Sequence, residues 1–370
     1  MKTINRMFAA LLALLWMLSA AVSAVDVSAG AAVLIEPSTG DVLYAKNADR
    51  RLPMASTTKI MTALVVLEQL NPADPVTVDE RACGVEGSSV YLKPGEVLTA
   101  EELLYALLLE SANDAAAALA YAVSGSIETF AGLMNDMAAR LRLTNTHFTN
   151  PHGLDNEAHY TTAADLARLS AYAMQNPVFA RIVGTVKHRI PGSDGGVRML
   201  LNHNRLLRLS SDVTGVKTGF TKRSGRCLVS AAERDGVSLI AVTLNAPDDW
   251  DDHLALHELG FSSYRSYPLA DAGEFSIEIP CAGAEDGFLT ASNHEALTLC
   301  RKQGVVFTHV IEAPHWLAAP ISEGDLVGRV LFSADGETVA SLPLYADESV
   351  QIRDGRPSLG QKIRSFFSGA

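Results

Sequence analysis

A serine and a lysine three residues apart are the clearest candidates for chemistry in this chain. Ser56 and Lys59 stand in the tetrapeptide Ser-Thr-Thr-Lys, and residues three apart share one face of a helix. A serine hydroxyl becomes a nucleophile when a neighbouring base takes its proton, and a lysine amine with a depressed pKa can do so. The pair therefore predicts covalent catalysis, with Ser56 as the nucleophile and Lys59 as its base.

The residues around this pair predict that it opens a buried helix. Apolar residues follow at once over 60–67, and Pro53 lies just upstream, where a chain entering a helix accepts proline. The N-terminal end of a helix carries partial positive charge. That end would face Ser56 and any anion that forms on it.

Two further motifs follow in the chain. Ser111 and Asn113 stand where a helical pattern breaks, so a loop can present both side chains to a cleft. Lys217-Thr218-Gly219 lies on a predicted strand, and the glycine leaves room for a ligand backbone to approach. The ordered set Ser-x-x-Lys, Ser-x-Asn and Lys-Thr-Gly occurs in penicillin-binding proteins and class A β-lactamases.

The rest of the chain supplies the elements that must position these motifs. A strand, a turn and a strand are predicted over 31–45, and helical patterns dominate from residue 56 to about residue 176. Thr99 and Glu102 have the spacing of a capping box, and another helix is expected from Thr162. Antiparallel strands are then predicted at 213–218, 226–231 and 238–243, and a helix at 249–259 closes the unit. Short alternating runs from residue 267 onward predict a small all-β domain.

Residues 1–24 have the pattern of a cleaved signal peptide. Lys2 and Arg6 precede an apolar stretch at 7–18, and small residues lead to a cleavage site after Ala24. A retained membrane anchor is the alternative, although the apolar run is short for a full span. The sequence therefore predicts an exported protein, in the cell wall or at the outer face of the cytoplasmic membrane.

The net charge of the chain argues against some classes of partner. The formal net charge is −12, and loss of the two basic residues of the signal segment makes it −14. Such acidity disfavours binding to the phosphate backbone of nucleic acids and to anionic lipid surfaces. No nucleic-acid partner is therefore expected.

On its three motifs the chain resembles the low-molecular-mass penicillin-binding proteins that are serine-type D-alanyl-D-alanine carboxypeptidases, of the peptidase S11 type. The resemblance runs from about Ala31 to Tyr267, and its supporting phrases are residues 53–62, 86–89, 150–154 and 214–219. It implies an α+β penicillin-binding and β-lactamase-like transpeptidase fold, with an antiparallel sheet and helices, followed by a small all-β domain. The expected segments are a signal peptide (1–24), the carboxypeptidase domain (25–266), the β-rich domain (267–352) and a tail (353–370).

The resemblance also implies a reaction. Ser56 would attack the carbonyl between the last two D-alanines of a peptidoglycan stem pentapeptide, and the terminal D-alanine would leave. Lys59 would be the general base, and Ser111 would relay a proton to the leaving amine. Water would then release the acyl-enzyme, and penicillins and other β-lactams would bind covalently at the same serine.

Further residues acquire binding roles from the resemblance. Asn113 would hydrogen-bond the peptide backbone of the substrate, and Thr218, in the segment that ends at Gly219, would hydrogen-bond its carboxylate. Lys217 would supply positive charge near Ser111 and near that carboxylate. The backbone N–H groups of the nucleophile and of Phe220 would form the oxyanion hole.

Two alternative functions remain open at this point. A class A-like β-lactamase would use a glutamate-activated water for deacylation, but Glu128 and Glu157 lack the expected Glu-x-x-x-Asn pattern. A non-catalytic wall-binding scaffold is the second alternative, although every motif residue is intact. His152 is expected to shape its loop rather than to take part in catalysis.

The cysteines and a histidine pair complete the candidates. In an exported protein Cys281 and Cys300 are the plausible disulfide pair, whereas Cys227 is expected as a buried thiol on a strand. His253 and His257 have the spacing of a zinc pair but are expected to be solvated helix residues. No metal and no other cofactor is expected.

The last residues, 353–370, carry a short amphipathic pattern. Leu359, Ile363, Phe366 and Phe367 fall at helical spacing, with basic residues on the other face. Peripheral membrane contact through this helix is one interpretation of the pattern, and a solvated, frayed end is the other.

Overall fold

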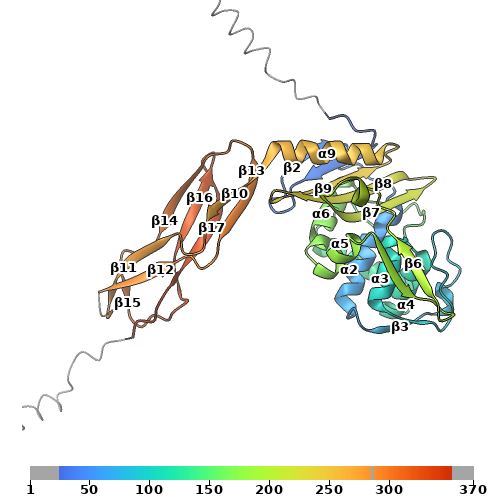
Figure 1. The fold of residues 1–370 in the computed structure, drawn as a ribbon, viewed down its shortest axis with the longest axis horizontal. Helices are drawn as coiled ribbons and strands as arrows, with labels where there is room; N and C mark the ends of the chain where they lie inside the picture. The colour runs from blue at the N-terminus through green and yellow to red at the C-terminus, as the bar shows by residue number, and fades with distance from the viewer. Residues whose placement is uncertain (1–24, 285–286, 352–370) are drawn as a thin grey trace, which may run out of the picture. The chain divides into compact units, whose positions relative to one another are not determined.

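The computed structural model describes residues 25–284 and 287–351, which form two compact units (Figure 1). Of the described residues, the first unit comprises 25–234 and 238–262, and the second comprises 235–237, 263–284 and 287–351. The signal peptide expected at 1–24 and the amphipathic helix expected at 353–370 lie outside the described residues, so both stay predictions.

An antiparallel sheet forms the framework of the first unit. Its strands lie in the order β2-β1-β9-β8-β7, and their bounds are β1 (Ala31–Ile35), β2 (Val42–Lys46), β7 (Val213–Thr221), β8 (Gly225–Arg234) and β9 (Val237–Leu244). β1 pairs with both β2 and β9, and β7 pairs with β8. The predicted strands are confirmed, and the pairing of β1 with β9 brings the two ends of the unit together.

Helices cover both faces of this sheet (Figure 1). They are η1 (Ala55–Thr58), α2 (Lys59–Gln69), η2 (Glu80–Ala82), α3 (Ala100–Leu109), α4 (Asn113–Ser124), α5 (Ile127–Arg140), α6 (Ala163–Met174), α7 (Pro177–Val183), α8 (Leu206–Leu209) and α9 (Asp249–Ser263). α9 lies on one face, and the group that contains α2 lies on the other. α2 packs against α3, α4, α5 and α6, so it lies inside the helical group.

Side-chain caps explain where several helices begin. The predicted capping box is confirmed: Thr99 accepts the N–H of Glu102, whose carboxylate accepts the N–H of Thr99. Thr162 caps α6 in the same way by accepting the N–H of Asp165. Such caps satisfy N–H groups that have no partner inside the helix.

The expectation that His253 and His257 are solvated is wrong. Both lie on the face of α9 that packs against the sheet, and both are buried. The Ser230 hydroxyl lies 2.6 Å from Nδ1 of His253 and 2.9 Å from Nε2 of His257, and the Thr243 hydroxyl lies 2.9 Å from Nε2 of His253. Polar residues of β8 and β9 thus give the imidazoles the partners that burial requires.

Two small two-stranded sheets also belong to the first unit. They are formed by β3 (Pro75–Thr77) with β4 (Val97–Thr99) and by β5 (Lys187–Pro191) with β6 (Val197–Leu201). Among the described residues no single helix is long and apolar enough to cross a bilayer, and only the bent pair of α4 and α5 together has the required length and composition.

The second unit is built from strands, as predicted. β10 (Tyr264–Ala270) pairs with β13 (Leu297–Lys302), and a second sheet has the order β14-β16-β17-β12-β11-β15. The strands of this sheet are β11 (Ser276–Ala282), β12 (Phe288–Ser292), β14 (Phe307–Glu312), β15 (Leu317–Ala318), β16 (Leu326–Ala334) and β17 (Glu337–Ala346). A small core lies under β16 and β17, around Val330, Phe332, Leu342 and Leu344.

The disulfide between Cys281 and Cys300, which the sequence left open, is not formed in the structure. Cys281 lies on β11 of the larger sheet and Cys300 on β13 of the smaller one, and the structure contains no bond between them. Cys281 instead packs into a small apolar cluster with Leu289 and Ile321. Cys227 is a buried thiol on β8, as expected.

Candidate active site

The start of α2 brings the predicted nucleophile and base together. Ser56 lies in η1, the single turn that leads into α2, and Lys59 is the first residue of α2 itself. The turn is tight, since Ala55 takes the left-handed conformation with φ of 47°. Residues in this region cost free energy and persist where the surroundings hold them.

Lys59 is fully buried and has three polar neighbours. Its Nζ lies 2.7 Å from Oδ1 of Asn113, 2.7 Å from the carbonyl oxygen of His152 and 3.1 Å from Oγ of Ser56. A neutral amine has two N–H groups and one lone pair. Donation to Asn113 and His152 therefore leaves the lone pair directed at the Ser56 hydroxyl, the arrangement that a general base requires.

The surroundings of Lys59 favour this neutral form. Burial lowers the pKa of Lys59 well below its usual value, the Lys217 cation lowers it further, and the Asp114 carboxylate raises it. Desolvation and a neighbouring like charge are the two effects that the sequence predicts for this lysine. A lysine that is neutral for part of the time can accept the proton of Ser56.

The loop between α3 and α4 carries Ser111 and Asn113. Ser111 has a positive φ of 61°, so the chain turns sharply there, and the residue itself is buried. Asn113 begins α4: its backbone N–H donates to the carbonyl of Ser88, and its side-chain amide donates to the carbonyl of Glu86. With Oδ1 on Lys59, Asn113 holds both the base and the segment at 86–88.

Strand β7 passes close to the nucleophile. A Cβ added to Gly219 would lie 3.0 Å from the backbone nitrogen of Ser56 and 3.1 Å from the carbonyl oxygen of Met54. Glycine is therefore needed because the two backbones approach each other. Phe220 follows Gly219 on the same strand and is 65% exposed, so its backbone N–H lies one residue from this close contact.

Lys217 is buried beside the site rather than exposed within it. Its side chain is only 1% exposed, and its Nζ donates to the carbonyl oxygen of Thr218 at 2.9 Å. Burial lowers its pKa to about 7. The strand therefore presents the hydroxyl of Thr218 to the cleft while the lysine amine stays behind it.

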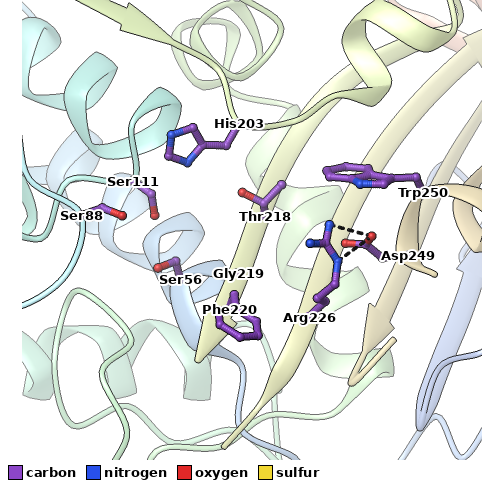
Figure 2. A pocket seen from close by; sticks show the side chains of 10 residues that line it. All are labelled: Ser56, Ser88, Ser111, His203, Thr218, Gly219, Phe220, Arg226, Asp249 and Trp250. Atoms are coloured by element: carbon purple, nitrogen blue, oxygen red, sulfur yellow. Dashed lines mark hydrogen bonds and ion pairs between the residues drawn. The ribbon is translucent and has the colours of Figure 1, made fainter. Parts of the chain in front are cut away.

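A cleft of about 290 Å³ joins these residues (Figure 2). It is lined by Ser56, Ser88, Ser111, His203, Thr218, Gly219, Phe220, Arg226, Asp249 and Trp250. Figure 2 shows three serine hydroxyls gathered on one side and the side chains of Arg226 and Trp250 on the other, with Thr218 between them. Lys59, Asn113 and Lys217 do not line it and act from behind its wall.

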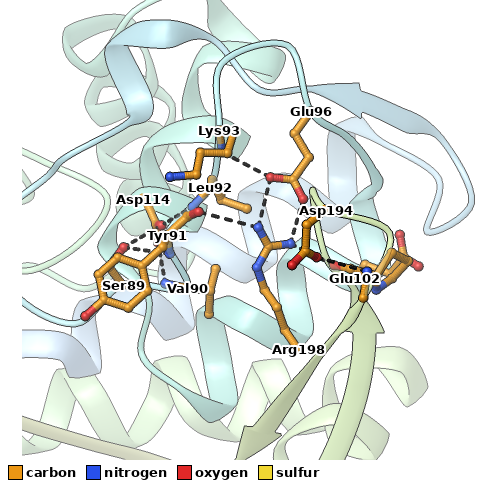
Figure 3. Close-up of polar contacts among 12 residues, drawn as sticks. Ser89, Val90, Tyr91, Leu92, Lys93, Glu96, Glu102, Asp114, Asp194 and Arg198 are labelled. Carbon is orange, nitrogen blue, oxygen red and sulfur yellow. Dashed lines mark hydrogen bonds and ion pairs between the residues drawn. The ribbon is translucent and has the colours of Figure 1, made fainter.

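Sequence reasoning missed Asp114, which organises one wall of the cleft (Figure 3). This carboxylate is fully buried and accepts the hydroxyl of Ser89 at 2.6 Å and the backbone N–H groups of Val90 and Leu92 at 3.2 and 3.0 Å. It thereby holds the segment that follows Ser88. A single acidic residue at the start of an alanine-rich helix is the signal that could have identified it.

A second anchor holds the far end of this segment. Arg198 on β6 forms an ion pair with Glu96 at 2.6 Å, and the same carboxylate accepts the N–H of Lys93 at 3.0 Å. Figure 3 shows Asp114 close to Tyr91, whose side chain is exposed, and the Arg198–Glu96 pair further along the segment. The segment at 86–96 is thus fixed at both ends.

Replacing Asp114 by asparagine is expected to loosen this wall. The change removes a buried acceptor of several hydrogen bonds, and bonds to charged groups contribute about 1.5–3 kcal/mol each. The unfolding temperature should fall, and the acid limb of the pH–rate profile should move to lower pH, because Asp114 raises the pKa of Lys59. Asp136→Asn, at an exposed site on α5, is the control, and an unchanged profile in Asp114→Asn would contradict the prediction.

Two histidines support the site from the loop at 147–159. His152 supplies the carbonyl that binds Lys59, which agrees with its expected loop-shaping role. His159 was missed by sequence reasoning: its Nε2 lies 2.7 Å from the hydroxyl of Thr58, and its Nδ1 accepts the N–H of Thr149. The pKa of His152 is lowered to about 3 and that of His159 to about 4, mainly by burial. Both therefore stay neutral.

The site lies between the helical group and the edge of an antiparallel sheet, and it places a serine next to a buried lysine. Fold and site together define a penicillin-binding serine acyl-transferase. The sequence profile of the peptidase S11 family, described as D-alanyl-D-alanine carboxypeptidase, matches residues 18–248. The chain belongs to this family and is a serine-type D-alanyl-D-alanine carboxypeptidase. A second profile, for the C-terminal domain of penicillin-binding protein 5, matches residues 288–351.

Individual relatives agree with this assignment. The chain is 33% identical over 334 residues to the D-alanyl-D-alanine carboxypeptidase DacF of Bacillus subtilis. The aligned region covers 87% of this chain and 86% of the relative. It is 34% identical over 349 residues to the D-alanyl-D-alanine carboxypeptidase DacC of Escherichia coli. That alignment covers 89% of this chain and 86% of the relative. The crystal structure of penicillin-binding protein 5 from Haemophilus influenzae superposes with a TM-score of 0.69 at 27% identity, over 89% of this chain and 99% of that one.

Proposed function

We propose that this carboxypeptidase removes the terminal D-alanine of peptidoglycan stem pentapeptides through an acyl-enzyme on Ser56. The observation that carries the proposal is the environment of Lys59, whose amine is buried, binds two acceptors and faces the Ser56 hydroxyl at 3.1 Å. As Ser56 attacks, Lys59 takes its proton. The tetrahedral oxyanion is then stabilised by the backbone N–H groups of Ser56 and Phe220.

The remaining motif residues divide the later steps among them. Ser111 lines the cleft beside Ser56 and passes a proton to the amine of the leaving D-alanine. Asn113 holds Lys59 in position, and its expected hydrogen bond to the substrate backbone stays a prediction, because both ends of its amide already bind Lys59 and Glu86. Lys217 provides positive charge behind the strand, and Thr218 hydrogen-bonds the substrate carboxylate. Water that reaches the acyl ester completes hydrolysis.

β-Lactams are the second class of ligand that this site fits. They present a strained amide and a carboxylate, the two groups that Ser56 and Thr218 would meet. A long-lived adduct on Ser56 would distinguish a penicillin-binding carboxypeptidase from a β-lactamase, which would release the opened antibiotic rapidly. The motifs also raised a class A-like β-lactamase and a non-catalytic wall-binding scaffold, and the family assignment favours neither of them.

We also propose that the chain acts outside the cytoplasm, where peptidoglycan lies. The signal-like pattern at 1–24 supports export. Residues 353–370 would add peripheral membrane contact through the amphipathic pattern of the tail.

The proposal is tested with purified protein that lacks residues 1–24. We expect it to release D-alanine from a peptide that ends in D-Ala-D-Ala and to lose this activity after incubation with penicillin. Peptide mass spectrometry should find the penicilloyl adduct on Ser56. If penicillin forms an adduct on Ser56 but no D-alanine is released, the proposed carboxypeptidase reaction is wrong and another acyl transfer takes its place. An adduct on another residue would overturn the assignment of Ser56 as the nucleophile.

A further inference from the structure

The peptide unit that joins Ala55 to Ser56 is held by contacts from a distant part of the chain. Ala55 contributes the carbonyl of this unit, is buried and has a positive φ of 47°. Ser56 contributes the N–H. A residue other than glycine costs free energy in this conformation, so the surroundings must hold it there.

The hydroxyl of Thr58 binds the carbonyl of this unit. It donates to the carbonyl oxygen of Ala55 at 2.7 Å, and Thr58 is fully buried. A hydroxyl group has a single proton. Because that proton is used on the carbonyl, the hydroxyl oxygen can only accept a hydrogen bond from a further neighbour.

His159 is that neighbour, and its hydrogen bonds determine its tautomer. Its Nε2 lies 2.7 Å from the hydroxyl oxygen of Thr58, which can only accept, so Nε2 carries the ring proton. Its Nδ1 accepts the backbone N–H of Thr149 at 3.0 Å, so Nδ1 is the unprotonated nitrogen. Both bonds require the same neutral tautomer. Burial lowers the pKa of His159 to about 4, which keeps the ring neutral at neutral pH.

The loop that carries His159 also touches the carbonyl directly. Gly153 has a φ of 89°, and a Cβ on this residue would collide with the carbonyl oxygen of Ala55 and lie 2.9 Å from the hydroxyl of Thr58. Only glycine therefore fits at this contact. The carbonyl is enclosed by the Thr58 hydroxyl and by the loop backbone, so its direction depends on where the loop lies.

The direction of this carbonyl decides the direction of the Ser56 N–H. A trans peptide unit is planar, and its C=O and N–H bonds point in opposite directions. The nitrogen of Ser56 faces β7, since a Cβ on Gly219 would lie 3.0 Å from it. This N–H is one of the two donors proposed for the oxyanion hole. Such donors are effective only when they are aimed at the position where negative charge develops.

We propose that His159 is a positioning residue for the oxyanion hole: it binds the Thr58 hydroxyl, which holds the Ala55–Ser56 peptide unit with its N–H aimed at the oxyanion. The inference rests on the proposed acyl-enzyme on Ser56, since that reaction creates the oxyanion. A neutral imidazole suits this task because it is rigid and carries a donor and an acceptor on separate ring nitrogens. His159 acts through Thr58 and not on the substrate.

Two variants that break this chain of hydrogen bonds and one that preserves it test the proposal. Thr58→Val keeps the branched shape but has no hydroxyl, and His159→Leu has neither donor nor acceptor. Each should lower the rate constant for acylation of Ser56 by penicillin by on the order of 10- to 100-fold, less than the loss of an entire oxyanion-hole donor. His159→Gln keeps an N–H donor and a carbonyl acceptor and should retain most of the wild-type rate.

The measurement separates orientation of the N–H from substrate binding. Saturation kinetics with penicillin gives both the dissociation constant of the non-covalent complex and the acylation rate constant. The loss should fall on the rate constant alone, because negative charge develops only as the bond to Ser56 forms. A boronic acid analogue of D-alanine, which forms a tetrahedral adduct with a serine hydroxyl, should lose affinity in parallel with the rate.

Controls separate orientation from folding. Active-site titration with fluorescent penicillin gives the fraction of competent enzyme in each preparation, and rates are expressed per competent site. Unfolding temperatures show whether each variant is folded. His147→Gln changes another imidazole in the same part of the chain, one that bonds the carbonyl of Ala158, and should acylate as the wild type does.

The outcomes are distinct. A wild-type acylation rate constant in His159→Leu or in Thr58→Val would overturn the positioning role, and so would an equal loss in His159→Gln and His159→Leu. A change confined to the dissociation constant would also overturn it. Failure of penicillin to acylate the wild-type protein at Ser56 would instead overturn the proposed function.

Discussion

Acylation of Ser56 by penicillin and release of D-alanine should both fall by on the order of 10²- to 10⁴-fold when Lys59 is replaced by methionine, the range measured for loss of a general base. Methionine has a similar length but cannot accept a proton. The buried amine lies 3.1 Å from the Ser56 hydroxyl, so the loss should appear in the acylation rate. Stopped-flow labelling with a fluorescent penicillin measures it directly.

The variant Lys59→Arg distinguishes a base from a fixed positive charge. Arginine keeps the cation but does not lose its proton in proteins, so it should be as inactive as methionine. In the wild-type protein, activity should rise with pH as Lys59 becomes neutral, and its lowered pKa places this rise below that of an ordinary lysine. An arginine variant that acylates at the wild-type rate would remove Lys59 from the role of base. Circular dichroism checks the fold, because both variants leave the Asn113 and His152 acceptors without an amine.

Acid should destabilise the first unit steeply below about pH 6.5, the usual pKa of histidine. Burial is the main cause that lowers the pKa of His257 to about 4, and it also lowers that of His253. Because the unfolded chain binds these protons more readily, stability is complete above the unfolded pKa and is lost as the pH falls toward the folded pKa. Each such histidine contributes a slope of about 1.4 kcal/mol per pH unit, which is large beside a total stability of about 5–15 kcal/mol.

Urea unfolding between pH 7.5 and 4.5 measures this slope. His257→Gln removes one titrating imidazole from beside Ser230 and should reduce the slope by about one proton. His147→Gln, at a more exposed imidazole that bonds the carbonyl of Ala158, is the matched control and should retain the full slope. A free energy of unfolding that stays constant from pH 6.5 to 4.5 would contradict the prediction.

The strongest sequence predictions concerned short-range patterns. The spacing of Ser56 and Lys59, the capping box at Thr99 and the strands on either side of residue 235 are decided within a few residues of each other. Local hydrogen bonds and apolar periodicity determine such features. They were therefore predictable, and the structure places the corresponding elements as expected.

Patterns that depend on packing misled the same reasoning. The polar residues of α9 indicated solvent around His253, but the opposing strands supply Ser230 and Thr243 as buried partners. The expected export of the chain allowed a disulfide between Cys281 and Cys300, yet the two residues belong to different sheets and form no such bond. In each case the partner lies far along the chain, so no local pattern records it.

The sequence by itself determined the chemistry of this protein: a serine nucleophile, a lysine near it, and two later motifs in the order that its family requires. Only the tertiary structure decided how that chemistry is supported. In the folded chain Asn113 accepts a hydrogen bond from Lys59, and Lys217 is buried. Asp114 binds the segment that follows Ser88, and Arg226 forms an ion pair with Asp249. The reason is physical: charge, burial and pKa depend on which residues meet in space, and these residues meet through contacts between segments that lie apart in the chain.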